Sequence, residues 1–305
     1  MSVISKFKNI NLIYRKLKVT DYSEFKKLFY LCFKRKITLK FFKWRYFNNR
    51  SSFCYGAFLS SKLIASVGMV SIKLNNNEEI FSRHSSMVLK KYRGIGIFSN
   101  LLEKVKTKIS KKINLVIMWP NNNNHSNFGI EKKKIIKKKY YLYKTLSSKK
   151  LLKKIKNYPI DDLNTFKNLI KNNKNNLFFK NFDYFKKRYI SYQKNEYLIN
   201  KFEFKKFSSF FILKRSRDKL GANYTILDHF GSRKIRSKHI SYLIMNQNKL
   251  IFLSKKKIHK HNYELLNHIN FKIGFMKKNN FKEKNNYLYN KEIFLGDTDI
   301  FLTLG

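Results

Sequence analysis

The chain has few of the residues that break or cross-link a polypeptide. Its 305 residues include 2 prolines, 10 glycines and 2 cysteines. So little proline and glycine excludes collagen-like and Pro/Gly-rich architectures. Cys32 and Cys54 cannot build a disulfide framework, and neither has His or Cys neighbours at metal-ligand spacing. We therefore expect two small buried thiols, no bound metal, and a protein of the reducing cytoplasm.

Long apolar runs are also missing. No stretch approaches the ~18 consecutive apolar residues that cross a bilayer. The first residues carry neither the apolar core nor the small-residue cleavage site of a signal peptide. Hydrophobic residues still make up 43% of the chain and aromatic residues 16%, which excludes a wholly disordered protein. The length suits one large domain or two ordinary ones of roughly 100–200 residues each.

Acidic residues are scarce: 18 Asp and Glu stand against 67 Lys and Arg, for a net charge of +49. Two explanations stay open. A genome rich in A and T enriches Lys, Asn, Ile, Phe and Tyr in any protein, although it does not deplete acids; affinity for a polyanion or an anionic membrane is the other. The lysines are spread along the whole chain, which argues against a dedicated docking segment. We expect non-specific polyanion or membrane contact and no specific nucleic-acid partner.

The first half alternates clear helix and strand patterns. Asp21 and Glu24 have capping-box spacing, and apolar residues follow at helical intervals. Turn residues then separate three apolar segments, which predicts an antiparallel meander. The expected elements are a helix over 25–33, a short helix over 41–46, strands over 54–59, 63–74 and 80–89, a helix from 98 to 109, a strand over 115–119, a short helix over 125–134 and a strand over 135–143.

The second half echoes the first. The segment Phe42 to Tyr46 recurs as Phe185 to Tyr189, so that Arg188 lies 143 residues after Arg45. A match this short can arise by chance in so Lys- and aromatic-rich a chain, but the shared order of elements favours a diverged duplication. The expected elements are partial helix within 144–181, strands over 210–214 and 224–230, a helix over 240–245, a strand over 250–253 and a helix over 263–271.

One segment carries a chemical signal: the turn Arg93-Gly94-Ile95-Gly96 between a strand and a helix. Glycines let backbone N–H groups approach a ligand, and the helix directs its unpaired N–H groups and positive dipole end into the same space. Such a site binds phosphate, and Lys90 and Lys91 add charge beside it. Taken alone, two glycines fit a structural turn equally well. Ser99 replaces the third glycine of the dinucleotide fingerprint, and no nucleotide-triphosphate loop is present.

The order helix, three-strand meander, glycine turn, helix and buried strand resembles the GNAT acyltransferase superfamily. Its motif Q/R-x-x-G-x-G/A is matched by Lys91 to Gly96, with Lys in the first place. The segments Tyr92 to Phe98 and Trp119-Pro120-Asn121 resemble one subgroup most closely. The resemblance covers about residues 10–145. The second half resembles the degenerate second domain of two-domain members, because Gly231-Ser232-Arg233-Lys234 stands where R-G-x-G would be.

The resemblance implies an α+β fold in which helices flank a mostly antiparallel central sheet, present as a tandem repeat. The implied domains are an acyltransferase domain over 1–148, a connecting helical segment over 149–181 and a degenerate domain over 182–305. It also implies acetyl-CoA as the donor. The residues that would contact this coenzyme are Met87, Val88 and Leu89 along the pantetheine arm, Arg93, Gly94, Ile95, Gly96 and Ile97 at the pyrophosphate, and Asn121 and Asn124 at the pantetheine amides.

The same resemblance points to His84, Ser86 and Val88 as catalytic residues. A backbone N–H near Val88 would polarise the thioester carbonyl. Family members often carry a carboxylate base on this strand, but residues 83–89 contain none. His84 is the nearest titratable group, and a half-exposed histidine with a structural hydrogen bond is the alternative.

Other candidates lie further along the chain. Phe128 stands near the place of the usual proton-donating Tyr, with Tyr140 and Tyr141 as substitutes or as packing residues. Asn121 to Asn124 fit a solvated loop as well as pantetheine ligands. Asp297 and Asp299 could receive a cationic amine; a capped turn or a salt bridge to one of the many lysines is the alternative.

The sequence therefore predicts an N-acyltransferase that moves an acetyl group from acetyl-CoA to a primary amine of a small molecule. An amino sugar or a surface polysaccharide precursor is the implied acceptor. A non-catalytic GNAT-fold protein that binds CoA or a polyanion is the alternative. An RNA-binding protein is a third reading, opposed by the lack of any RNA-binding signature and by aromatic residues at core periodicity.

Overall fold

The computed structural model describes residues 11–48, 51–75, 77–110, 115–118, 135–145, 156–170, 179–190, 197–215, 224–246, 250–254 and 263–275. The chain divides into two compact units. Unit 1 comprises Met1–Lys73, Glu79–Lys137 and Lys272–Asn285, and unit 2 comprises Leu74–Glu78, Lys138–Phe271 and Asn286–Gly305.

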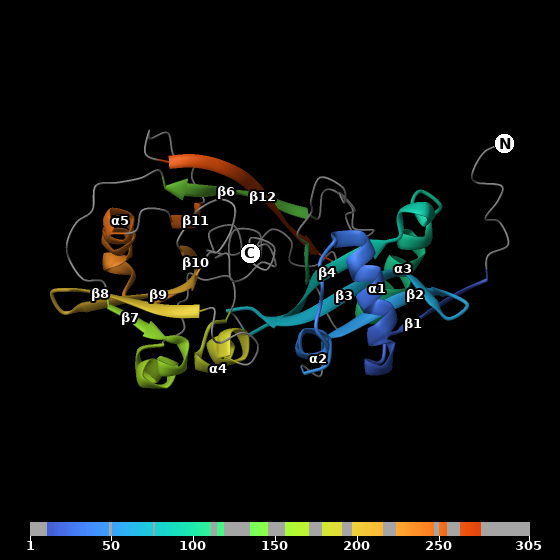
Figure 1. Cartoon of the computed structure of the whole chain (residues 1–305), viewed down its shortest axis with the longest axis horizontal. Coiled ribbons are helices and arrows are strands. Elements are labelled where there is room, and N and C mark those ends of the chain that lie inside the picture. The colour runs from blue at the N-terminus through green and yellow to red at the C-terminus, as the bar shows by residue number, and fades with distance from the viewer. Residues whose placement is uncertain are drawn as a thin grey trace. The chain divides into compact units, whose positions relative to one another are not determined.

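Both units contain helices and strands (Figure 1), and in each unit three consecutive strands precede a 3-10 helix and an α-helix. Short 3-10 helices cover Val19–Asp21, Lys90–Tyr92, Ile160–Leu169 and Arg233–Ile235, and a π-helix covers Lys186–Ile190. The remaining elements are β1 (Leu12–Lys16), α1 (Tyr22–Phe33), α2 (Leu39–Tyr46), β2 (Phe53–Leu59), β3 (Lys62–Lys73), β4 (Glu79–Val88), α3 (Ile97–Ser110), β5 (Leu115–Met118), β6 (Ile135–Thr145), β7 (Lys156–Pro159), α4 (Phe182–Phe185), β8 (Tyr197–Phe204), β9 (Phe207–Arg215), β10 (Tyr224–Gly231), α5 (Arg236–Asn246), β11 (Leu250–Ser254) and β12 (Tyr263–Phe275).

Unit 1 is built on a sheet with the strand order β1-β2-β3-β4-β5-β12. The strands from β1 to β4 are antiparallel neighbours, β5 runs parallel to β4, and the end of β12 runs antiparallel to β5. The sequence predicted the meander of β2, β3 and β4, which the structure confirms. All four residues of β5 are buried, as expected for a strand inside a sheet that is covered on both faces.

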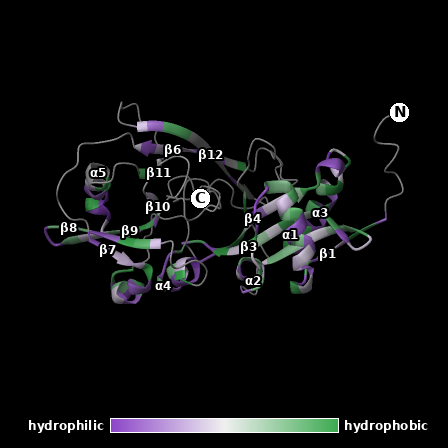
Figure 2. Cartoon of the chain, viewed as in Figure 1, coloured by the Kyte–Doolittle hydropathy of each residue, from purple (hydrophilic) through white to green (hydrophobic). Residues whose placement is uncertain are grey.

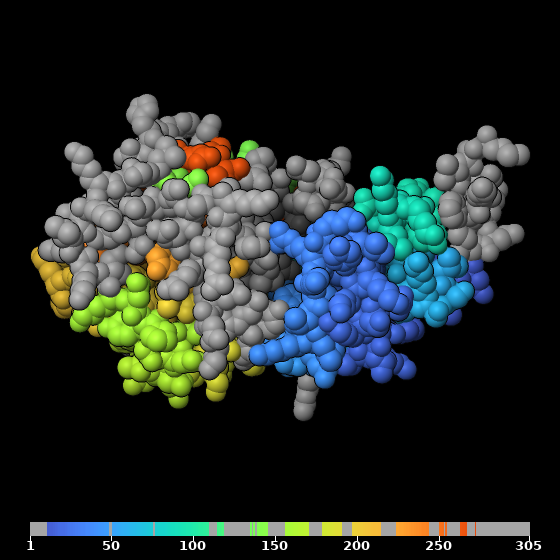
Figure 3. Space-filling view, in the orientation of Figure 1, coloured from blue at the N-terminus to red at the C-terminus, as the bar shows by residue number. Residues whose placement is uncertain are grey.

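Helices cover both faces of this sheet. The Tyr46 ring of α2 lies against Gly68, whereas Lys108 of α3 lies over the ring of Tyr55, the cross-strand partner of Val67. Successive strand residues point to opposite faces, so α2 and α3 lie on opposite sides of the sheet. The side chains of α1 and α2 form the blue surface in front of β3 (Figures 1 and 3), and apolar residues (green) line the strands beneath them (Figure 2).

The predicted capping box at the start of α1 is wrong. Asp21 makes no cap hydrogen bond to α1; its carboxylate accepts from both terminal nitrogens of Arg15 at 2.7 Å and, as a cap of the 3-10 helix Val19–Asp21, from the Lys18 backbone N–H at 2.7 Å. Glu24 instead reaches forward to the β3 backbone, where it accepts from the Leu63 N–H at 3.4 Å. Both carboxylates are therefore used to tie α1 to neighbouring strands, a tertiary role that spacing in the sequence does not show.

The segment 263–271 is also not the helix that the sequence predicted. It belongs to β12, a strand of 13 residues whose last part pairs with β5, with Gly274 opposite Val116. Apolar residues in fact occupy six of the seven alternate positions from 263 to 275, all but Asn267, as a strand requires: Tyr263, Leu265, Ile269, Phe271, Ile273 and Phe275. The segment forms a strand because it pairs in the sheet and because its strand-like alternation is stronger than its helical pattern.

Unit 2 repeats the plan of unit 1. Its strand order is β6-β11-β10-β9-β8-β7, and β10 pairs antiparallel with β9 and parallel with β11, as β4 does with β3 and β5. The 143-residue offset seen in the sequence extends over the whole first part of the repeat. It carries the 3-10 helix Lys90–Tyr92 onto Arg233–Ile235 and the cap of α2, Thr38, onto the cap of α4, Asn181. The predicted α+β tandem repeat is thus confirmed.

Most of the other predicted elements are present. The helices at α1, α2, α3 and α5 and the strands at β2 to β6 and β9 to β11 are confirmed, whereas β1, β7 and β8 were not predicted. The partial helix expected within 144–181 is the 3-10 helix Ile160–Leu169, which Pro159 precedes. The predicted short helix over 125–134 lies outside the described residues. Among the helices described here, none is long and apolar enough to span a bilayer.

Unit 2 contains a buried polar network around Ser209. The Ser209 hydroxyl lies 3.0 Å from Nε2 of His229 and 2.9 Å from Nδ1 of His239, and Nε2 of His239 lies 2.6 Å from Oδ1 of Asn200. Burial lowers the pKa of His239 to about 3 and holds the pKa of His229 well below its usual range. Both imidazoles are therefore neutral in the folded protein at neutral pH.

This network predicts that the protein loses stability in mild acid. The folded state resists protonating His229 and His239, whereas the unfolded chain protonates them near pH 6.5. Their contribution is complete above that pH and declines as the pH falls, by up to about 1.4 kcal/mol per pH unit for each histidine. Urea unfolding at pH 7.5, 6.0 and 5.0 measures the decline. His239→Gln should flatten the slope, and a pH-independent midpoint would contradict the assignment.

Candidate functional site

One edge of β4 opens where its neighbour β5 ends. In the described part of the chain, β5 pairs with β4 only across Phe81–Arg83, which face Val116–Met118. On the other side, β3 stays paired with β4 as far as Val88. The residues from Ser85 to Val88 therefore keep one paired edge, toward β3, while their other edge has no partner strand among the described residues.

Hydrogen bonds show which backbone groups face this open edge. The Leu89 N–H donates to the Ile64 carbonyl at 3.0 Å, so Leu89 faces β3. Backbone groups alternate along an antiparallel pair, so the N–H and C=O of Val88 face the opposite way, toward the open edge. Met87, one residue earlier, faces β3 like Leu89. Of the three predicted pantetheine contacts, Val88 is the one that offers both backbone groups to a ligand.

A bulge interrupts β4 just before Val88. The register shifts between the pairs Ser66–Met87 and Gly68–His84, which leaves two β4 residues, Ser85 and Ser86, opposite Val67. Ser85 adopts φ = 46°, in the left-handed region that costs a non-glycine residue of order 1 kcal/mol. Two hydrogen bonds oppose this cost. The Ser85 hydroxyl lies 2.6 Å from the Tyr46 hydroxyl, and the Ser66 hydroxyl donates to the Ser85 carbonyl at 3.4 Å.

Tyr46 is held in place by packing from two helices. It is 1% exposed, and its ring contacts Phe25 of α1 and Phe42 of α2 at centroid distances of 5.8 and 5.7 Å. Gly68 provides the room on the strand side, because a Cβ there would lie 2.4 Å from the Tyr46 ring. The side chain of Tyr46 thus reaches the bulge through a space that only a glycine leaves open.

The predicted catalytic residues lie around this bulge. His84 is the cross-strand partner of Gly68, so it lies on the face that Tyr46 covers. At 6% exposed it is buried, not half-exposed. Ser86 and Val88 are partly exposed and follow the bulge directly. The structure thus brings His84, Ser86 and Val88 onto one short stretch of backbone beside the open edge.

The glycine turn follows immediately after β4. Gly94 and Gly96 have φ values of 81° and 84°, which L residues rarely adopt, and nothing lies within 4 Å of a Cβ built on either. Conformation, not crowding, therefore requires glycine at both positions. The first helical bond of α3 runs from the Asn100 N–H to the Gly96 carbonyl. The N–H groups of Ile97 and the two residues after it have no acceptor within the helix, as in any first turn.

Arg93 is tied to the protein in two ways. Its backbone N–H donates to the Lys90 carbonyl at 3.3 Å, and its side-chain Nε donates to the Val88 carbonyl at 3.0 Å. The Cys32 thiol of α1 contacts the same carbonyl at 3.6 Å. Burial raises the pKa of this thiol, and the nearby Arg93 guanidinium partly offsets the rise. The Val88 carbonyl is thus occupied by the protein's own side chains.

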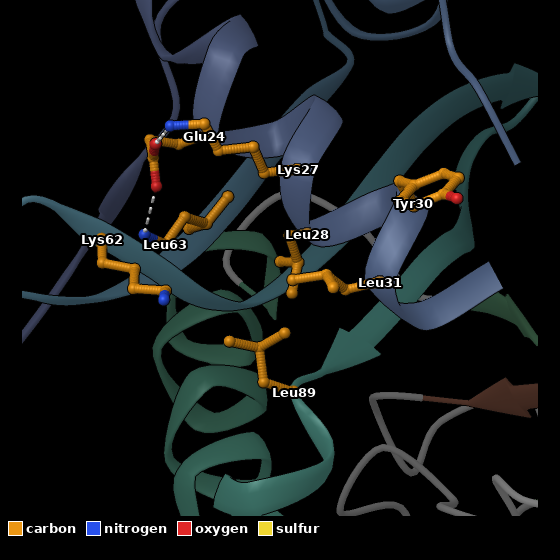
Figure 4. A pocket seen from close by; sticks show the side chains of 8 residues that line it. All are labelled: Glu24, Lys27, Leu28, Tyr30, Leu31, Lys62, Leu63 and Leu89. Atoms are coloured by element: carbon orange, nitrogen blue, oxygen red, sulfur yellow. Dashed lines mark hydrogen bonds and ion pairs between the residues drawn. The ribbon is translucent and has the colours of Figure 1, made fainter. Parts of the chain in front are cut away.

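A separate groove of about 240 Å³ lies between α1 and the start of β3 (Figure 4). Its apolar lining consists of Leu28, Leu31, Leu63 and Leu89, and charged side chains lie at its rim. At the rim, the Glu24 carboxylate accepts hydrogen bonds from the Lys27 ammonium and the Leu63 N–H. None of the turn residues from Arg93 to Ile97 lines it. The groove therefore excludes the glycine turn but includes Leu89, the residue after Val88 and one of the predicted pantetheine contacts.

Several predicted residues lie elsewhere. Asn121, Asn124, Phe128, Asp297 and Asp299 are outside the described residues. Tyr140 and Tyr141 belong to unit 2, where Tyr140 is buried and Tyr141 is the strand partner of Ser254. Within the described ranges, no three His, Cys, Asp or Glu side chains gather as metal ligands would.

Sequence reasoning missed the Tyr46–Ser85 bond and the two contacts on the Val88 carbonyl. Tyr46 was visible in the repeated motif, but its hydroxyl partner lies 39 residues away. A β-bulge leaves little trace in hydrophobic periodicity, and no spacing rule connects it to a helix. The positive φ of Ser85 could not be predicted either, because glycine, not serine, is the residue that indicates this conformation.

Replacing Gly68 with alanine tests the packing at the bulge. The new methyl would overlap the Tyr46 ring and force it away from Ser85. We expect Gly68→Ala to lower the free energy of unfolding by about 1–3 kcal/mol, as overpacked cores do. Urea unfolding measures the change. Gly94→Ala, where nothing crowds the new methyl but φ is 81°, is the control and measures backbone strain alone, of order 1 kcal/mol. A loss in Gly68→Ala no larger than this strain would contradict the close contact.

Comparison with known proteins gives a match in structure but not in sequence. No protein-family model matches the sequence, and no curated protein matches it. Solved structures match over most of the chain. A GCN5-related N-acetyltransferase from Anabaena variabilis superposes with a TM-score of 0.60 at 10% identity, and the match covers 88% of this chain and 73% of that one.

Two further structures agree. A GCN5-related N-acetyltransferase from Kribbella flavida matches with a TM-score of 0.57 at 9% identity, covering 86% of this chain and 70% of that one. A structure from Pyrococcus horikoshii matches with a TM-score of 0.58 at 11% identity, covering 95% and 96%. Each match extends across both units of this chain. The chain therefore has the GNAT fold, the fold of the GCN5-related N-acetyltransferases.

Proposed function

We propose that the protein is an N-acyltransferase that moves an acetyl group from acetyl-CoA to a primary amine. The observation that carries the proposal is the open edge of β4 leading directly into a two-glycine turn at the start of α3. An extended arm can pair with such an edge as an added strand, and a phosphate can accept from the N–H groups of such a turn. Coenzyme A has both parts in the same order, an extended pantetheine arm followed by a pyrophosphate.

The pyrophosphate is proposed to accept hydrogen bonds from the backbone of Gly94, Ile95, Gly96 and Ile97. The Arg93 N–H is already bonded to the Lys90 carbonyl, so Arg93 would act through its guanidinium instead. Lys90, Lys91 and Arg93 are exposed beside the turn and add positive charge. Open space around both glycines leaves the backbone accessible to a bulky anion.

The pantetheine arm is proposed to pair with Val88. An amide N–H of the arm would donate to the Val88 carbonyl. The Arg93 Nε now donates to that carbonyl at 3.0 Å, so this bond must break when the coenzyme binds. The Val88 N–H, or that of Ser86, would donate to the thioester carbonyl and stabilise the negative charge that develops during attack. Asn121 and Asn124 remain proposed contacts to the pantetheine amides.

Direct transfer within one complex needs the amine held close to the thioester and relieved of a proton. We keep His84 as the proposed base. Because it is buried, a water or hydroxyl would have to carry the proton to it. The proposed acceptor is a small amine, with amino sugars and polysaccharide precursors first in the screen. We also propose a cytoplasmic location, where thiols such as Cys32 and Cys54 stay reduced.

Calorimetry with acetyl-CoA and substitutions at Gly94 tests the proposal. Gly94→Glu places a carboxylate where the pyrophosphate would lie, so binding should weaken at least ~100-fold, since two like charges at contact cost several kcal/mol. Gly94→Ala separates backbone strain from charge and should bind nearly as well as the wild type. Thr107→Glu adds the same charge at an exposed site later on α3 and should bind normally.

The titration needs high salt, because a protein of charge +49 attracts any polyanion. Saturable binding that Gly94→Glu alone abolishes supports the coenzyme site, and an amine screen follows. Binding without transfer to any amine would favour a non-catalytic coenzyme-binding protein. Equal weak binding by all four proteins would contradict the proposed site and leave only non-specific polyanion affinity.

A further inference from the structure

The two units share one tyrosine at equivalent places. Tyr189 lies 143 residues after Tyr46 and is likewise buried against a phenylalanine of the preceding turn, Phe185. Its hydroxyl donates to Oδ2 of Asp228 at 2.7 Å, and Asp228 lies 143 residues after Ser85. In both units, therefore, a helix tyrosine bonds the same position of the equivalent strand, next to a shift in strand register.

The partner of this tyrosine differs between the units. In unit 2, Asp228 is fully buried and bonded to the Lys180 ammonium at 2.5 Å, so the position is sealed by an ion pair that is itself 1% exposed at most. In unit 1, Ser85 is partly exposed and adopts a positive φ at the open edge of β4. The residue bonded to the shared tyrosine is thus fully buried in unit 2 and partly exposed, at the open edge of β4, in unit 1.

The two units also differ in the segment that comes after this strand. In unit 1, four residues, Arg93 to Gly96, separate the 3-10 helix Lys90–Tyr92 from α3. In unit 2, α5 begins at Arg236, directly after the 3-10 helix Arg233–Ile235. Beyond Thr225, β10 also has no partner strand on that side among the described residues, but its residues from Thr225 to Phe230 are all buried. The tyrosine bond therefore accompanies partly exposed strand residues and a glycine turn only in unit 1.

We propose that Tyr46 is a positioning residue, whose hydroxyl holds Ser85 in the bulge and so directs the N–H groups of Ser86 and Val88 at the thioester carbonyl of the bound acyl-CoA. The ligand in this statement rests on the proposed function; the bulge itself does not. Tyr46 need not touch the substrate. Its bond fixes a serine in a conformation that the residue does not favour, and the backbone beyond that serine takes its direction from it.

The first arm of the test needs no ligand. Amide hydrogen exchange of the β4 segment 84–89, followed by mass spectrometry, reports how firmly the bulge is held. In Tyr46→Phe, which keeps the ring and loses the hydroxyl, exchange in this segment should be roughly tenfold faster, as expected for one lost buried hydrogen bond. Tyr189→Phe loses the equivalent bond in unit 2 and controls for a general loss of stability. It should leave the β4 segment unchanged.

The second arm uses two probes that differ only at the carbonyl: acetyl-CoA and its thioether analogue S-ethyl-CoA. A directed N–H donor should make the wild type bind acetyl-CoA more tightly than S-ethyl-CoA. Tyr46→Phe should reduce this preference by roughly fivefold to tenfold, the effect of one hydrogen bond. Its affinity for S-ethyl-CoA should not change. A merely structural tyrosine would weaken both probes alike.

A double substitution separates positioning through the bulge from direct contact between Tyr46 and the ligand. Glycine adopts a positive φ without cost, so Ser85→Gly should allow the bulge to form without the tyrosine hydroxyl. The variant Tyr46→Phe/Ser85→Gly should therefore recover both the slow exchange and the acetyl-CoA preference. If the Tyr46 hydroxyl instead bonded the thioester carbonyl itself, slow exchange would return in this variant but the acetyl-CoA preference would not.

The outcomes distinguish the two proposals. If the wild type binds neither probe, the proposed function fails, while exchange in Tyr46→Phe still decides the role of Tyr46 at the bulge. If exchange in Tyr46→Phe equals that of the wild type, or if Tyr189→Phe loosens β4 equally, Tyr46 does not hold the bulge and the inference is overturned. Loss of both probes in parallel would also overturn it.

Discussion

Beyond Arg83, one edge of β4 carries backbone N–H and C=O groups that are not bonded to any strand among the described residues. Backbone N–H and C=O groups are rarely left without a partner, so this edge calls for another chain, a side chain or a ligand. In the structure, Arg93 and Cys32 occupy the Val88 carbonyl. The edge, the bulge and the glycine turn lie on consecutive residues, so a single extended ligand that ends in a phosphate group would satisfy all three.

The repeat shows how one framework gives two different results. The same strand order and the same helix tyrosine appear in both units, along with the same 3-10 helix after the central strand. Unit 1 adds four residues, Arg93 to Gly96, between that 3-10 helix and α3, whereas α5 comes directly after it in unit 2. Unit 2 also replaces the serine with a buried ion pair, Lys180–Asp228. The short insertion and the polar substitution account physically for one open site and one closed core.

Sequence patterns predicted the elements better than the contacts between them. Periodicity located α1 and α3 because their apolar residues fall on one face, turn residues between apolar segments located the meander, and the glycine turn was evident from its composition. The capping box was wrong because Asp21 and Glu24 have tertiary partners, and 263–271 was wrong because strand pairing decided a mixed pattern. The bulge could not be found, because it depends on Tyr46 and Gly68, residues that meet only once α2 packs on the sheet.

A crystal structure of the protein with coenzyme A would test the central claim most directly. The account predicts that the pantetheine arm pairs with Val88 along the open edge of β4 and that the pyrophosphate lies on the N–H groups of Gly94 to Ile97. It also predicts that the Arg93 side chain has left the Val88 carbonyl. A coenzyme bound elsewhere, with the bond between Arg93 and Val88 intact, would contradict the account.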